Sequence, residues 1–140
     1  MIRFVPDTNV LTSATIVQEG ASSQILQAWQ RGEVELITSP VLLQELEKTL
    51  SRPRIQKYQW MGPEEVLKLL VELKQAAIQA SGEQRVYVIS EDPDDDFVLS
   101  AAVEQKADYI VSGDRHLLTL GSYQDIEIVT PAAFLKILKQ

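Results

Sequence analysis

Residues 2–9 read Ile2-Arg3-Phe4-Val5-Pro6-Asp7-Thr8-Asn9, and this stretch decides how the rest of the chain is interpreted. A short apolar run ends at a proline, and a carboxylate follows it at once. Apolar runs of this length, bounded by turn-forming residues, indicate buried strands. Further short apolar runs occur along the chain, and acidic residues follow several of them as Asp7 follows the first.

Five such strands are predicted, with helical patterns between them. Strands that alternate with helices favour one α/β domain with a mostly parallel sheet. No internal repeat, low-complexity segment or second domain is visible, so residues 1–140 are expected to form a single domain. The apolar residues of the five predicted strands lie at 2–5, 34–37, 86–89, 110–111 and 126–129.

The helix boundaries carry recognisable signals. Ser39 is placed to cap a helix whose first residue is Pro40, a combination typical of helix N-termini. Pro63 is expected to open a longer helix that includes Ile78 and ends near Gly82. A last helix is expected to begin at Pro131 by the same rule.

Composition excludes several classes of site. The chain has no cysteine and a single histidine, which excludes disulfides, thiolate metal sites and zinc sites that need several imidazoles. Thirteen basic against 20 acidic residues give a net charge of −7, which disfavours non-specific binding to DNA or anionic membranes. No targeting segment and no apolar run near the ~18 residues of a membrane span are visible, so a cytoplasmic protein without membrane contact is expected.

Acidic residues follow several predicted strands, where open parallel sheets bind their ligands. Asp7 follows the first strand, residues 94–96 are three aspartates after the third, and Asp114 follows the fourth. Glu45 lies about two turns into the helix after the second strand, and helical phase does not separate it from Glu47. Carboxylates that converge repel one another unless hard divalent cations such as Mg²⁺ or Mn²⁺ join them.

Each of these acids also has a purely structural interpretation. Asp7 and Asp114 occur in sequences typical of turns and caps, and acids at residues 91–96 favour the positive end of a helix dipole. Glu45 alone would be a solvated helix residue. Their joint placement at the strand ends is what favours a site.

Four blocks of sequence together resemble the PIN-domain family, and the resemblance covers essentially the whole chain. No single block is specific, but their order and spacing are. The compact length and the run of aspartates most resemble the branch that comprises toxins of toxin–antitoxin systems, the VapC-like ribonucleases. The four blocks are Val5-Pro6-Asp7-Thr8-Asn9, Ser39-Pro40-Val41-Leu42-Leu43-Gln44-Glu45-Leu46, Asp92-Pro93-Asp94-Asp95-Asp96-Phe97-Val98-Leu99 and Ile110-Val111-Ser112-Gly113-Asp114.

The resemblance implies a three-layer α/β/α sandwich with a mostly parallel five-stranded sheet of order 3-2-1-4-5. It also implies a Mg²⁺- or Mn²⁺-dependent ribonuclease that hydrolyses RNA phosphodiester bonds. A small antitoxin protein and a second copy in a homodimer would be its protein partners. The family's catalytic and metal-binding acids fall on Asp7, Glu45, Asp96 and Asp114.

Further residues are expected to support this site. Hydrogen bonds from Thr8, Asn9 and Ser112 would orient the carboxylates and water, and Asp94 or Asp95 would reach the metal from behind the direct ligands. Four clustered cations, with aromatic residues just beyond them, are candidates for contacts with RNA phosphates. These are Lys48, Arg52, Arg54 and Lys57.

Other functions remain open at this point. A receiver-type signalling domain would need a lysine after a late strand, where Thr130 and Pro131 stand instead. A phosphatase of the haloacid-dehalogenase type would need an aspartate where Asn9 stands. A non-catalytic PIN-like scaffold that binds protein or RNA, and a nuclease that cuts DNA, are the remaining alternatives.

Overall fold

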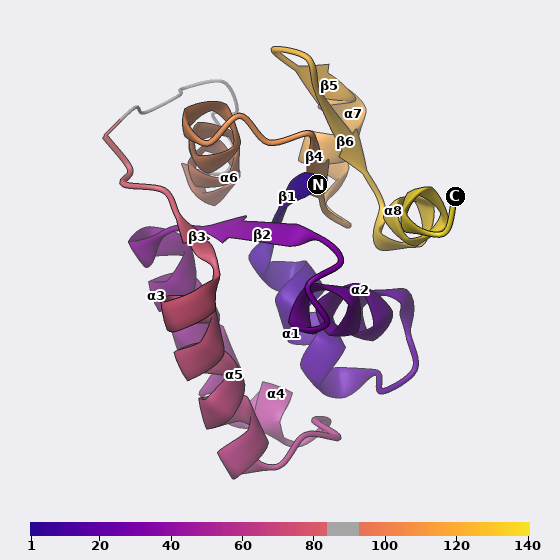
Figure 1. Ribbon diagram of the computed structural model, residues 1–140. Coiled ribbons are helices and arrows are strands. Elements are labelled where there is room, and N and C mark those ends of the chain that lie inside the picture. The colour runs from indigo at the N-terminus through magenta and orange to yellow at the C-terminus, as the bar shows by residue number, and fades with distance from the viewer. Residues whose placement is uncertain (84–92) are drawn as a thin grey trace.

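The structure is a computed structural model that describes residues 1–83 and 93–140 (Figure 1). The strand expected at residues 86–89 lies outside the described residues. Within the described ranges, no helix is both long enough and apolar enough to cross a bilayer.

Six strands form one sheet in the described part of the chain, in the order β3-β2-β1-β4-β6-β5. All neighbouring strands pair in parallel except β5 and β6, which form an antiparallel hairpin. The first five places match the expected order 3-2-1-4-5, with β6 in the fifth place, but the third strand is Ile78–Gln79, and the strand expected at 86–89 is not tested. The described residues form six strands, one more than the five expected, because β5 extends the edge. The strands are β1 (Arg3–Pro6), β2 (Glu35–Thr38), β3 (Ile78–Gln79), β4 (Tyr109–Val111), β5 (Ser122–Tyr123) and β6 (Ile126–Val129).

Helices cover both faces of this sheet, as the α/β/α sandwich requires (Figure 1). Buried side chains form two apolar clusters, and successive residues of β1 divide between them: Phe4 belongs to one and Val5 to the other. This alternation is the period-two pattern of a strand that is covered on both faces. The helices are α1 (Thr8–Ile16), α2 (Ala21–Gln30), α3 (Pro40–Leu50), α4 (Pro53–Gln56), α5 (Pro63–Ala76), α6 (Pro93–Glu104), α7 (Arg115–Leu120) and α8 (Pro131–Leu138).

The helix starts follow the local signals. The Ser39 hydroxyl accepts a hydrogen bond from the backbone N–H of Leu42 at 3.4 Å, and Pro40 occupies the first turn of α3. Pro63 and Pro131 likewise lie in the first turns of α5 and α8. These three predictions are confirmed. A cap or a proline acts on backbone groups within a few residues, so the local sequence is enough to predict where these helices begin.

The end of α5 differs from the expectation. The helix ends at Ala76, and Ile78 lies in β3, where it pairs with Ile37 of β2. The Gln79 side chain donates hydrogen bonds to the carbonyls of Leu73 at 3.0 Å and Ala77 at 3.4 Å, and so satisfies groups at the helix end. The prediction that Ile78 continues the helix is wrong because pairing with β2 outweighs helical periodicity.

Candidate active site

Two neighbouring parallel strands bring Asp7 and Ser112 together at their carboxyl ends. Pro6 pairs with Val111, and the backbone N–H of Asp7 donates to the Val111 carbonyl at 2.9 Å. The Ser112 hydroxyl donates to Asp7 Oδ2 at 2.7 Å and accepts from the backbone N–H of Asp114 at 2.9 Å. Ser112 therefore links the first and the fourth of the acids selected from the sequence.

Asp7 is a buried carboxylate that is hard to ionise. Only 7% of the residue is exposed. Burial raises the pKa of Asp7 above its ordinary value, and the nearby charge of Asp114 raises it further, although hydrogen bonds from Ser112 and Thr8 oppose the shift. The Thr8 hydroxyl donates to Asp7 Oδ1 at 3.4 Å. A cation held between Asp7 and Asp114 would remove the energetic penalty of two ionised carboxylates.

The raised pKa of Asp7 makes stability depend on pH. The folded state binds the proton of the Asp7 carboxyl more tightly than the unfolded state does. The stabilisation that this proton gives is therefore fully present below pH 3.8 and is lost as the pH rises through the raised pKa. Asp7→Asn removes this loss and keeps an oxygen to accept from Ser112. In EDTA at pH 7 we expect the variant to melt a few degrees higher than wild type, since ~1 kcal/mol shifts Tm by roughly 3–4 °C for a domain of this size.

Thermal melts from pH 4 to pH 8 measure this difference. The difference in Tm between Asp7→Asn and wild type should become smaller as the pH falls toward 4. A wild type that is as stable as the variant throughout this range would show that Asp7 titrates normally in the folded protein.

Asp114 has a structural role as well as a place beside Asp7. Its Oδ1 accepts hydrogen bonds from the backbone N–H groups of His116 at 2.7 Å and Leu117 at 3.4 Å, and so caps α7. Within residues 1–83 and 93–140, its Oδ2 accepts no hydrogen bond. One carboxylate group thus caps a helix through Oδ1, and its Oδ2 has no hydrogen bond among the described residues.

The first turn of α6 carries the dense run of acids. Asp95 and Asp96 are 2% and 5% exposed, and the side chain of Asp94 lies outside the described residues. The helix packs against β1 and β4, which are the strands that precede Asp7 and Asp114. The Asp96 carbonyl accepts from the Ser100 hydroxyl at 2.7 Å, one turn further along α6. Burial alone does not separate Asp95 from Asp96.

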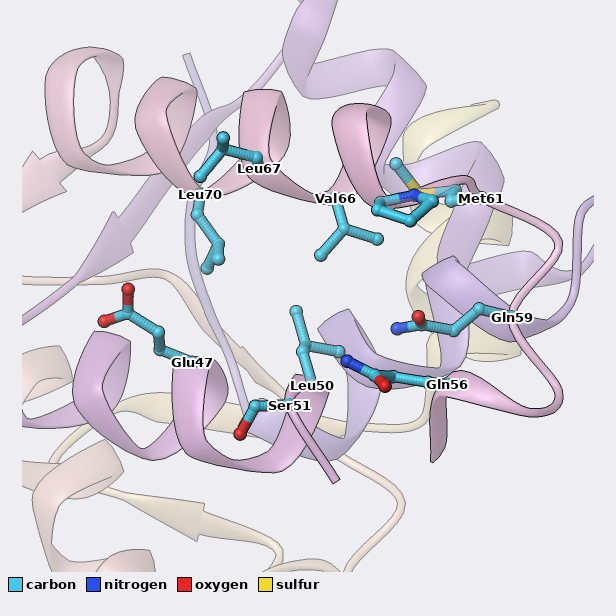
Figure 2. Close-up of a pocket in the computed structure, with 10 residues that line it drawn as sticks. Glu47, Leu50, Ser51, Gln56, Gln59, Met61, Val66, Leu67 and Leu70 are labelled. Atoms are coloured by element: carbon cyan, nitrogen blue, oxygen red, sulfur yellow. The ribbon is translucent and has the colours of Figure 1, made fainter. Parts of the chain in front are cut away.

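The structure separates Glu45 from Glu47, which lie on opposite flanks of α3. Glu47 lines a cavity of about 330 Å³ between α3 and α5, across from Leu67 and Leu70 (Figure 2), and its Oε1 lies 3.7 Å from Lys74 Nζ. Glu45 is half-buried and one helical turn before Thr49, which faces α1. Because α1 starts directly after Asp7, the flank of α3 that carries Glu45 and Thr49 is the one on which a contact with the candidate site is expected.

A metal-binding cluster is not assembled in the described part of the chain. Among residues 1–83 and 93–140, no three acidic or histidine side chains gather closely enough to hold an ion. The candidate donor set fits a hard cation nonetheless, since all of its members are carboxylates, and two of them, Asp7 and Asp114, are linked through Ser112. The elements that carry Glu45 and Asp96, α3 and α6, pack against each other.

The four candidate RNA-contact cations lie on α3, α4 and the residues beside α4, and all are exposed. In the ranges that the structure describes, none of them pairs with a carboxylate. Lys57 Nζ lies 5.6 Å from the centre of the Tyr58 ring, a cation–π contact on the surface. These charges are available to phosphates. They are Lys48, Arg52, Arg54 and Lys57.

Comparisons with known proteins agree with the architecture. A sequence model of the PIN domain matches residues 3–116. An uncharacterized protein of Methanocaldococcus jannaschii is 31% identical over 120 residues, which cover 85% of this chain and 75% of that protein. The matched region contains Asp7, Glu45, Asp96 and Asp114 and ends before the last strands and α8.

Proposed function

The chain belongs to the PIN domain family, whose members are generally nucleases, and from this premise we propose that it is a Mg²⁺- or Mn²⁺-dependent endoribonuclease. One observation carries the proposal. Asp7, buried at the end of β1, is joined through Ser112 to Asp114 at the end of β4. Carboxylates that share one low-dielectric position are the arrangement in which a divalent cation binds.

The four acids Asp7, Glu45, Asp96 and Asp114 would hold the cation. When bound, the cation lowers the pKa of water and polarises the scissile phosphate. Ser112 holds Asp7 Oδ2 in one orientation, while Thr8 donates only a long hydrogen bond to Oδ1. No side chain of this set needs to act as a nucleophile, because water attacks the phosphorus and the ribose oxygen leaves.

Cleavage of a labelled single-stranded RNA, beside the matching DNA, tests the proposal. We expect cutting of RNA in Mg²⁺ or Mn²⁺ and none in EDTA. Cutting of DNA alone would move the substrate from RNA to DNA. A folded protein that binds Mn²⁺ but cuts neither strand would contradict the general nuclease and leave only a restricted target.

Glu45 and Glu47 give a matched pair of variants on one helix. Glu45→Gln is expected to lower the cleavage rate at least ~10-fold, because it removes one of the negative charges that attract the cation. Glu47→Gln should leave the rate unchanged and cost less than about 1 kcal/mol of stability, since its ion pair with Lys74 is exposed. Initial rates at saturating metal compare the two, and equal rates would remove Glu45 from the site.

A non-catalytic scaffold that binds RNA or protein is the second candidate function. It is favoured by the lack of a group of three metal-binding side chains among residues 1–83 and 93–140. Isothermal titration with Mn²⁺ separates the two candidates. Absence of both Mn²⁺ binding and cleavage would support the scaffold.

The proposal extends to the role of a toxin in a toxin–antitoxin pair, with a small antitoxin protein and a homodimer as assemblies. The dense aspartate run supports this branch of the family. The mainly apolar cavity between α3 and α5 (Figure 2), whose lining residue Leu67 is 62% exposed, offers surface for a protein partner. Light scattering on the purified chain measures the dimer, and a monomer at micromolar concentration would contradict it.

A further inference from the structure

A second groove lies between α1 and α3, on the flank of α3 that carries Glu45. It has a volume of about 320 Å³, and among the residues that the structure describes, no charged side chain lines it. We propose that this groove binds the base and ribose of one unpaired nucleotide of single-stranded RNA, next to the phosphate that is cut. The inference rests on the proposed nuclease function. The groove is lined by Thr8, Asn9, Thr12, Ser13, Ile16 and Thr49.

The lining combines carbon surface with groups that hydrogen-bond. Threonine methyl groups and Ile16 supply apolar surface, which suits the face of a base. Hydroxyl and amide groups stand between them. The Thr12 hydroxyl donates to the Thr8 carbonyl at 2.9 Å, so its lone pairs remain to accept from a ligand. A ribose 2′-hydroxyl both donates and accepts, and it finds both partners in this set.

The groove begins at the candidate site itself. Thr8 lines the groove and also donates to Asp7 Oδ1. A nucleotide seated there therefore places its backbone beside the buried carboxylate. The groove lacks charge, so it suits the neutral parts of the nucleotide, while the phosphate is left to the metal-binding acids.

Two cations lie close in sequence to Thr49, which lines the groove. Lys48 directly precedes Thr49, and Arg52 follows it by three residues. Both are exposed, and within the described ranges neither pairs with a carboxylate. On a chain with net charge −7, these two exposed cations are positions that attract phosphates.

The proposal requires an unpaired strand. In a duplex, the bases are stacked and paired, so none is free to enter a groove between two helices. Binding is therefore expected to favour single-stranded RNA over the same sequence in a duplex.

Two variants that fill the groove test the inference. Ser13→Phe and Thr49→Phe are made on an Asp96→Asn background that leaves RNA intact, and the Kd of a labelled ten-nucleotide RNA is measured by anisotropy in Mg²⁺. We expect about tenfold weaker binding for each, a loss of about 1.4 kcal/mol, because the added ring occupies the space that the base would fill. Gln27→Phe, which adds the same ring on the exposed face of α2, should bind as the background does.

A third variant protects the test from misfolding. Thr49→Val keeps the shape of the side chain and removes only its hydroxyl, and we expect about threefold weaker binding with an unchanged melting temperature. Equal Kd values for all variants would overturn the inference, as would a background protein that binds no single strand, or an equal loss in Gln27→Phe.

The outcomes for the groove and for the nuclease are separate. Wild-type cleavage of RNA with no effect of the groove variants on Kd would overturn only the groove. Loss of binding in Ser13→Phe and Thr49→Phe, in a protein whose wild type cuts nothing, would support the groove and overturn the nuclease.

Discussion

Asp7→Asn is expected to abolish metal-dependent cleavage of RNA, by at least ~10²–10³-fold, while the protein stays folded. Loss of a hydrogen-bond partner behind a metal ligand already costs 10–100-fold, and loss of a ligand's charge costs more. Asp7 interacts with Asp114 and accepts from Ser112, so the amide removes the negative charge at the centre of the set. Single-turnover cleavage at fixed Mn²⁺ measures the effect.

Asp125→Asn is the matched control for this variant. Asp125 is exposed in the turn before β6, and its φ of 68° is one that asparagine adopts readily. This control removes the same charge and should leave the rate unchanged. Retention of more than a tenth of the wild-type rate by Asp7→Asn would exclude Asp7 as a metal ligand.

The same substitution should raise stability without metal and remove activity with it. In a metal-binding site, the charge of Asp7 destabilises the metal-free fold and is essential to the reaction. A residue that only caps a helix has neither property. A structural Asp7 would behave oppositely, because its replacement would destabilise the protein and leave any cleavage in place.

Phe134→Ala is expected to lower the free energy of unfolding by about 3–5 kcal/mol. Phe134 in α8 is fully buried, and its ring centre lies 4.8 Å from that of Phe4 and 5.5 Å from that of Tyr109. The truncation leaves a cavity among side chains of β1, β4 and α8. Urea unfolding gives the change directly, and Tm should fall by roughly 10–20 °C.

Phe134→Leu serves as the control, since it keeps most of the apolar volume and should cost much less than the alanine variant. This prediction bears on the extent of the domain. The PIN domain match ends at residue 116, but α8 packs against β1 and β4 inside that range. We propose that residues 1–140 form one domain, and a loss under 1 kcal/mol in Phe134→Ala would show that α8 is dispensable.

The starts of α3, α5 and α8 were predictable from the sequence because their signals are local. Ser39 with Pro40, and the prolines at 63 and 131, act on backbone groups within one turn. The apolar runs at β1, β2, β4 and β6 likewise identify buried strands, and their alternation with helices determines the α/β class. The short α1 carried no such signal, because its polar residues Thr8 and Asn9 are equally compatible with a turn.

The groove between α1 and α3 was missed for the same reason. Thr8 with Thr12, and Asn9 with Ser13, are four residues apart and share one face of a helix. Once residues 8–16 are assigned as helical, that spacing indicates a polar face made of these four residues. No spacing within α1 indicates Thr49, which comes from another helix.

By itself, the sequence determined the starts of α3, α5 and α8, the α/β class and the list of candidate acids. Only the tertiary structure decided that Ile78 lies in a strand, that Glu47 lies beside Lys74 of α5, and that Asp7 is buried against Ser112. Caps and periodicity act over a few residues, whereas Asp7 and Ser112 are separated by 105 positions. Their meeting depends on the register of two parallel strands, which no local pattern encodes.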